Sequence, residues 1–110
     1  MRELPQGEII ELMAKNPEGD LACDFTLAED VAAVRRGLER GILEPPRQIE
    51  GGVEVTFRAD AWNAVHRYVE MESQCCAFLN LAAEQNDQGI ILRVTGRAEA
   101  QEFIRSIFAQ

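Results

Sequence analysis

Basic residues are scarce in this sequence. It has 11 lysines and arginines against 19 acidic residues, which gives a formal net charge of −8. Binding nucleic acid without regard to sequence requires clustered basic side chains, and so does docking on an anionic membrane surface. We therefore expect neither a nucleic-acid partner nor a membrane partner.

Long apolar runs are missing as well. No window approaches the roughly 20 apolar residues that a membrane-spanning helix needs. The N-terminal stretch carries acidic residues and has no apolar segment of signal-peptide length. These absences predict a cytoplasmic protein. The length fits one α+β domain over residues 1–110, with an N-terminal amphipathic helix appended at residues 1–16.

The common catalytic motifs are also absent. The chain has no phosphate-binding glycine motif, no G-x-S-x-G and no paired-histidine zinc motif. Its one histidine, His66, follows Trp62 at helical spacing, which is more typical of a partly buried helical residue than of a metal ligand. An enzyme is therefore the least favoured class.

Cysteines are few and odd in number. The chain contains Cys23, Cys75 and Cys76, and the last two are adjacent. Neighbouring cysteines that pair with each other close a strained eight-membered ring, and a cytosolic protein keeps its thiols reduced. We therefore expect reduced thiols that are packed in the core, reactive, or bound to a metal.

Hydrophobic periodicity predicts an α+β fold in the order α-βα-ββα-ββα. About five strands would form one mainly antiparallel sheet with the helices on one face, ferredoxin-like in part through a split β-α-β start. The predicted helices cover residues 5–15, 26–41, 62–76 and about 100–108. The predicted strands cover residues 21–27, the second half of 43–50, 53–57, 78–84 and 90–95.

Several local signals support these boundaries. Thr26 and Glu29 have the spacing of a capping box, and Asp60 is placed to cap the next helix. Pro45-Pro46 confines the strand that contains it to a sheet edge, because proline cannot donate a ladder hydrogen bond. Gly51-Gly52 is typical of a two-residue hairpin turn.

The stretch from Trp62 to Phe78 holds the strongest candidate site. Its apolar residues repeat at helical spacing, which predicts an amphipathic helix that ends at the two adjacent cysteines. Glu72 lies three residues before Cys75 and four before Cys76, so a helix brings its carboxylate beside both sulfurs.

These residues support three interpretations. In the first, Cys75, Cys76 and Glu72, together with an inward-facing Cys23, bind a thiophilic metal or metalloid ion, because thiolates are soft ligands. The absence of C-x₂-C argues against tetrahedral structural zinc.

In the second interpretation the cysteines are core residues of an interaction module that forms a homodimer or binds an unknown protein. Glu72 then pairs with an arginine such as Arg93 or Arg97. The third, a thiol enzyme, ranks last, because a neighbouring carboxylate and a helix C-terminus both raise the pKa of a thiol.

The segment Glu72–Phe78 resembles the E-x-x-C-C-P-F motif of small, mostly uncharacterised bacterial proteins. In that family an L-x-I-T-G-like segment and an apolar last helix follow, and Leu92–Gly96 and Phe103–Phe108 match them here. The resemblance covers the chain from Trp62 onward and implies a link to heavy-metal or thiol stress. Ala77 stands where the family has proline.

Overall fold

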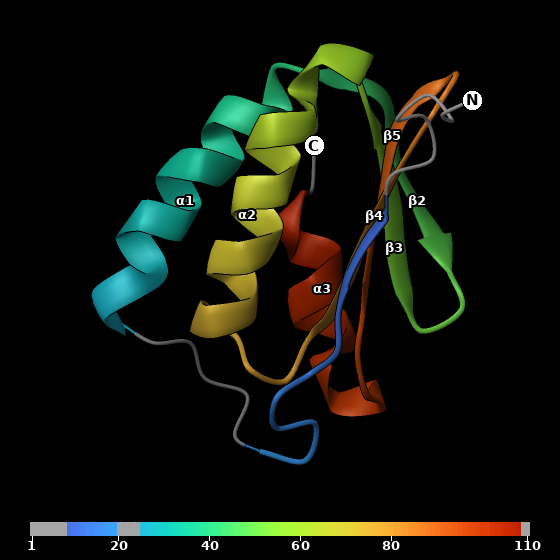
Figure 1. Cartoon of the computed structure of the whole chain (residues 1–110). Helices are drawn as coiled ribbons and strands as arrows, with labels where there is room; N and C mark the ends of the chain where they lie inside the picture. Colours follow the sequence, from blue (N-terminus) through green and yellow to red (C-terminus); the bar gives the residue numbers. More distant parts are fainter. Residues whose placement is uncertain (1–8, 20–24, 109–110) are drawn as a thin grey trace, which may run out of the picture.

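The computed structural model describes residues 9–19 and 25–108, and it has the predicted α+β architecture. Its five strands and three helices alternate along the chain (Figure 1). They are β1 (Ile9–Leu12), α1 (Phe25–Glu39), β2 (Ile42–Ile49), β3 (Gly52–Phe57), α2 (Trp62–Cys75), β4 (Asn80–Asn86), β5 (Gly89–Thr95) and α3 (Gln101–Ile107). Short 3₁₀ turns, Ala59–Ala61 and Ala98–Ala100, precede α2 and α3.

The strands form one sheet in the order β1-β4-β5-β3-β2, and every neighbouring pair is antiparallel. It follows that β1 and β2 run parallel at opposite edges, linked through α1. This is a split β-α-β connection, but its first strand is β1 and not the expected strand at residues 21–27, and three strands separate its two parallel strands.

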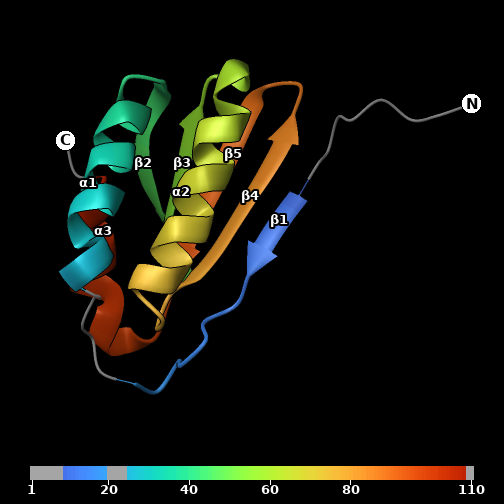
Figure 2. The ribbon, with the colours of Figure 1, turned by 60° about the vertical axis from the view of Figure 1, so that its left-hand side comes forward.

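All three helices lie on one face of the sheet, as Figures 1 and 2 show. The strands send alternate side chains into the space between the two layers, so Val53, Val55 and Phe57 of β3 are buried. The Phe108 ring packs edge-on against Phe57 and Tyr68, with centroid separations of 5.8 and 5.6 Å. The core therefore joins the sheet, α2 and the C-terminal end of α3.

The N-terminal prediction was wrong for the residues that the structure describes. Ile9–Leu12 is a strand and not part of a helix, and it pairs with β4. Ile10 and Leu12 face the core, whereas Ile9 and Glu11 are exposed. Four residues are too few for periodicity to separate a strand from a helix, and the open edge of β4 decides the outcome.

The expected strand at residues 21–27 lies partly outside the described residues. Where the chain is described again, from Phe25, it is already helical, so the strand does not reach Leu27. The capping box at Thr26 was also misplaced, because α1 includes that residue.

Two local predictions need small corrections, one for the cap of α2 and one for the hairpin turn between β2 and β3. Asp60 does not cap α2; Ala61 occupies that position without a side-chain hydrogen bond, and Asp60 pairs with Arg58 at 2.8 Å. The hairpin turn is Glu50-Gly51, one residue earlier than predicted, with Gly51 at φ 83°.

The strand that contains Pro45-Pro46 is an edge strand, as predicted. It is longer than expected, because β2 begins at Ile42 and accommodates the prolines through register shifts between residues 42 and 47. The predicted strands at 53–57, 78–84 and 90–95 correspond to β3, β4 and β5 with shifts of one or two residues. Within the described ranges, no helix combines the length and apolar character that crossing a bilayer requires.

Candidate functional site

The candidate site lies at the C-terminal end of α2, which packs against both α1 and β4. The helix ends where predicted, with Cys75 as its last residue and Cys76 as its C-cap. The Cys76 backbone N–H donates to the Glu72 carbonyl at 2.7 Å, and the Leu79 N–H donates to the Cys76 carbonyl at 3.1 Å. These bonds fix the two cysteines between the last helical turn and the entry to β4.

The structure brings three of the four predicted site residues together. One carboxylate oxygen of Glu72 and the sulfur atoms of Cys75 and Cys76 all lie within 4.8 Å of one another. All three side chains are buried, with Glu72 only 1% exposed. Cys23, the fourth predicted residue, lies outside the described residues.

Glu72 is the centre of the polar contacts. The Tyr68 hydroxyl donates to Glu72 Oε2 at 2.5 Å, one helical turn earlier on α2. Cys76 Sγ lies 3.4 Å from Glu72 Oε1. Arg35 Nη1, from α1, lies 3.8 Å from Glu72 Oε2. The carboxylate therefore has one strong donor, one sulfur neighbour and one partly buried cation.

Burial sets the protonation behaviour of this cluster. Loss of solvent raises the pKa of Glu72, although the Tyr68 hydrogen bond and the Arg35 charge oppose the rise. Burial also raises the pKa of Tyr68 well above its ordinary value, and the charge and hydrogen bond of Glu72 add to the effect. The phenol therefore stays neutral and available to donate.

The state of Cys76 differs from the expectation of reduced thiols. The structure holds Cys76 in a disulfide-bonded form. A sulfur in that form has no thiolate to offer a metal ion, so any ion binding that uses Cys76 belongs to the reduced protein.

Arg35 is a residue of the candidate site that the sequence analysis did not single out. Its side chain is only 27% exposed, and its Nη1 lies 3.8 Å from Glu72 Oε2. The position of α1 beside α2 determines this contact, and no local pattern encodes it. The Tyr68 contact, in contrast, was detectable from its i, i+4 spacing to Glu72.

The arginines expected to pair with Glu72 have other partners. Arg93 pairs with Glu54 and Glu84 across the sheet. Arg97 donates hydrogen bonds of 2.5 Å to the carbonyl oxygens of Pro17 and Gly19.

His66 lies where the sequence placed it. Its ring packs on Trp62 at a centroid separation of 6.0 Å, and its Nδ1 lies 3.6 Å from Glu70. It does not belong to the cluster formed by Glu72, Cys75 and Cys76.

Comparisons with known proteins leave the site to be interpreted from its own chemistry. No protein-family model, curated protein or solved structure gives a significant match to this chain.

Proposed function

We propose that the reduced protein binds a thiophilic metal or metalloid ion through Cys75 and Cys76, with Glu72 as a third ligand. The observation that carries the proposal is the convergence of two sulfurs and a carboxylate oxygen within 4.8 Å in a buried site. Sulfur donors favour soft ions such as zinc, mercuric ion and trivalent arsenic. The protein then serves as a sensor, buffer or accessory protein for such an ion and not as an enzyme.

The charges around the site support a cation as the ligand. Two thiolates and the Glu72 carboxylate together carry three negative charges, and Arg35 supplies one positive charge at 3.8 Å. A divalent ion neutralises the remainder, which removes the penalty of holding uncompensated charge in a buried place. The Tyr68 hydroxyl donates to Glu72 Oε2 and so holds the carboxylate in position, as second-shell donors do in many metal sites.

The second candidate is an interaction module with structural cysteines. The ion pair between Glu72 and Arg35, together with the complete burial of Cys76, favours it, because both are typical of a packed core. In this case the cluster fixes α1 against α2, and no ion is required.

Native mass spectrometry of the reduced protein with zinc, mercuric ion or arsenite distinguishes the two candidates. We expect a one-to-one adduct that disappears in the double variant Cys75→Ser/Cys76→Ser. Ser73→Ala, a change on the same helical turn, is the matched control and keeps the adduct. Glu72→Gln keeps a hydrogen-bond acceptor for Tyr68 but weakens the adduct through loss of charge.

Two further results complete the test. Cys23→Ser shows whether the third cysteine contributes a ligand, because its loss then lowers affinity without abolishing binding. Equal behaviour of the wild type and the double variant overturns ion binding and leaves the cysteines as core residues. Circular dichroism of each variant establishes that lost binding does not reflect lost folding.

A further inference from the structure

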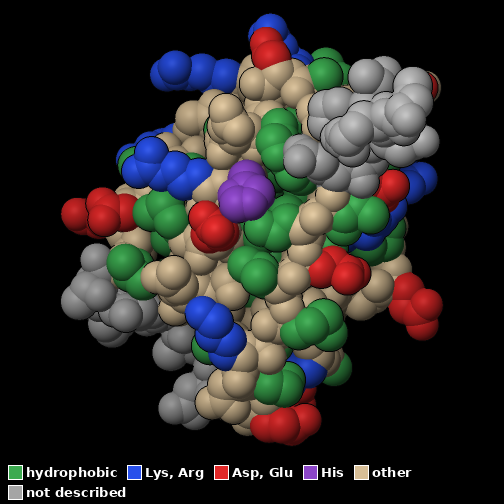
Figure 3. All heavy atoms as spheres, in the orientation of Figure 1, with side chains coloured by type: hydrophobic (Ala, Val, Ile, Leu, Met, Phe, Trp, Pro, Cys, Tyr) green, Lys and Arg blue, Asp and Glu red, His purple; other side chains and the backbone are tan. Residues whose placement is uncertain are grey.

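The face of the sheet opposite the helices is uncovered in the part of the chain that the structure describes (Figures 1 and 2). Alternate side chains of each strand project from this face, and they are mostly half-buried or exposed. In Figure 3, where the helices lie to the left of the sheet, acidic, basic and apolar side chains are mixed over the surface. The open face has a regular charge pattern instead.

Four charged residues cross this face, here called the charge row: Glu84, Arg93, Glu54 and Arg47. They belong to the neighbouring strands β4, β5, β3 and β2, so their charges alternate as −, +, −, +. Glu84 is the register partner of Ile91, so it lies two residues along the strands from the line of the other three. Arg93 is the register partner of Glu54, and Glu54 is the register partner of Arg47.

Each member of the charge row pairs with its neighbour. Arg93 Nε lies 2.9 Å from Glu54 Oε2, and Arg93 Nη1 lies 3.5 Å from Glu84 Oε1. Arg47 pairs with the other oxygen of Glu54. These contacts hold the charges in fixed positions, and the side chains remain 12 to 72% exposed. The row is thus an ordered pattern that a second molecule can contact.

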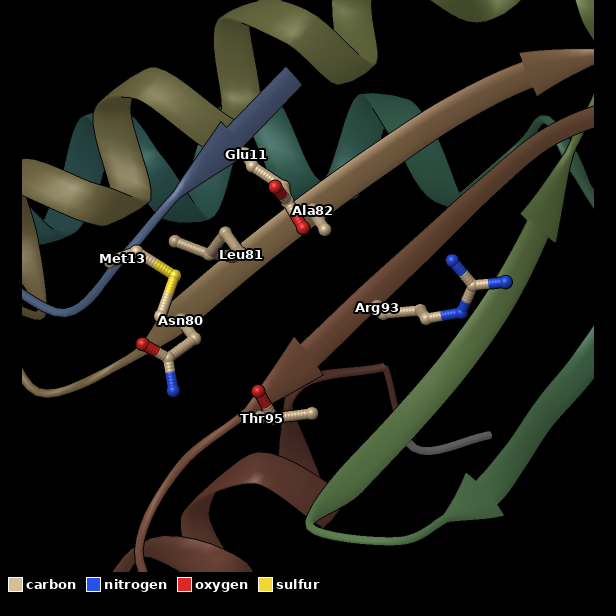
Figure 4. A pocket seen from close by; sticks show the side chains of 7 residues that line it. All are labelled: Glu11, Met13, Asn80, Leu81, Ala82, Arg93 and Thr95. Carbon is tan, nitrogen blue, oxygen red and sulfur yellow. The ribbon is translucent and has the colours of Figure 1, made fainter. Parts of the chain in front are cut away.

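Apolar residues flank the charge row. Of the four large apolar side chains that are exposed in the described residues, Ile9 projects beside Glu84 on β1. Met13 lines a hollow with Arg93 and Thr95, shown in Figure 4. Leu43 lines a second hollow with Arg47 and Glu54. The face therefore combines apolar edges with a charged centre.

We propose that this face binds a second copy of the chain in a symmetric homodimer whose two-fold axis runs parallel to the strands. Such an axis reverses the charge row of the partner, so each charge meets one of opposite sign. Arg93 of one copy faces Glu54 of the other, and Glu84 lies diagonally to Arg47, displaced by two residues along the strands. A two-fold axis parallel to the charge row instead places each charged residue opposite the same residue of the other copy. Like charges then face each other, which disfavours that arrangement. The proposal is independent of the thiol site.

The size of the face sets the expected affinity. Five strands at about 4.8 Å and about six residues at 3.4 Å give a patch of roughly 24 by 20 Å. This is smaller than the roughly 800 Å² per partner of a standard interface, so we expect a weak, reversible dimer. Because charge pairs contribute, dissociation increases with salt.

Sedimentation equilibrium at rising protein concentration tests the proposal. We expect a wild-type monomer–dimer equilibrium, and Arg93→Glu or Glu54→Arg alone to weaken it by at least tenfold. An equimolar mixture of these two variants restores a heterodimer, since all facing charges are again opposite. The double variant Arg93→Glu/Glu54→Arg restores a homodimer for the same reason.

The control is Arg67→Glu, which makes the same change of charge at an exposed position on α2 and leaves the dimer intact. Rescue by mixing cannot arise from repaired folding, because each variant keeps its own broken pair. A wild type that stays monomeric at millimolar concentration overturns the proposal. So does a dimer that is indifferent to Arg93→Glu, which assigns another surface to self-association.

Discussion

The Tyr68 hydroxyl and the Glu72 carboxylate form a buried hydrogen bond of 2.5 Å within a single helix. Both residues are at most 1% exposed. A charged acceptor buried to this degree needs a donor, because an unpaired one loses its hydration without compensation. This bond therefore contributes to the stability of the fold whether or not the site binds an ion.

Tyr68→Phe should lower the free energy of unfolding by about 1–3 kcal/mol, because it leaves the Glu72 acceptor without its strongest donor. Urea denaturation of the reduced protein measures the change. The double variant Tyr68→Phe/Glu72→Met removes both polar partners and should recover part of the loss. A Tyr68→Phe variant as stable as the wild type contradicts the importance of the bond.

Tyr68 is the only tyrosine, so its ionisation can be followed by absorbance without interference from another phenol. Its pKa is raised by burial and by Glu72. A raised folded-state pKa means that the stabilisation is complete below pH 10.0, the ordinary value, and is lost as the pH rises toward the folded-state pKa. We expect phenolate to appear only when the protein unfolds in alkali. A smooth titration near pH 10 in the folded protein contradicts the burial of this hydroxyl.

The lowered pKa of Glu54 predicts how the stability of the fold changes in acid. Burial raises its pKa, but hydrogen bonds from Arg47 and Arg93 outweigh this and lower the pKa below 4.5. A lowered pKa stabilises the fold above that ordinary value, and the contribution disappears as the pH falls through the folded-state pKa. Glu54→Gln should therefore flatten the loss of stability in this acid range. Glu102→Gln, at an exposed position on α3, is the control and should keep the wild-type profile.

Two glycines should respond to alanine in opposite directions. A Cβ at Gly37, inside α1, has nothing within 4 Å, so Gly37→Ala should stabilise the protein by about 0.5–1 kcal/mol. A Cβ at Gly52 would lie 1.9 Å from the Val94 carbonyl oxygen, so Gly52→Ala must displace β3 from β5. We expect a clear drop in melting temperature for Gly52→Ala. The same small effect at both positions contradicts the pairing of β3 with β5.

The disulfide state of Cys76 leads to a prediction about ion binding. A disulfide-bonded sulfur offers no thiolate, so the ion adduct should form only after reduction. Native mass spectrometry of the protein with and without a reductant measures the difference. An adduct that forms equally well on the unreduced protein contradicts a role for the Cys76 thiolate.

The long periodic segments could be predicted from the sequence. The apolar residues that repeat at helical spacing from Trp62 to Cys76 predicted α2 and its end at the thiols. The alternation of apolar and polar residues in Val53–Phe57 predicted β3. In each case a local period determines which side faces the core, so no tertiary information is needed.

The remaining features depend on contacts between distant parts of the chain. Ile9–Leu12 is a strand because the edge of β4 is open to it, some 70 residues later. Arg35 reaches Glu72 because α1 packs on α2. The adjacency of Glu72 to the two sulfurs was predictable from helical spacing, whereas the second helix that supplies the counter-charge was not.

The pairing of β1 with β4 also determines how the chain completes its fold. The hairpins β2–β3 and β4–β5 each close a loop of a few residues. The pairing of β1 with β4 closes a loop of some 70 residues, and the larger entropy cost of that closure makes it a slow step in folding. The strand is short, and the Asn16 N–H beyond it bonds the carbonyl of Ala77, next to Cys76. Transient release of β1 is therefore the least demanding opening of the sheet, and it uncovers the end of α2 where the thiols are buried.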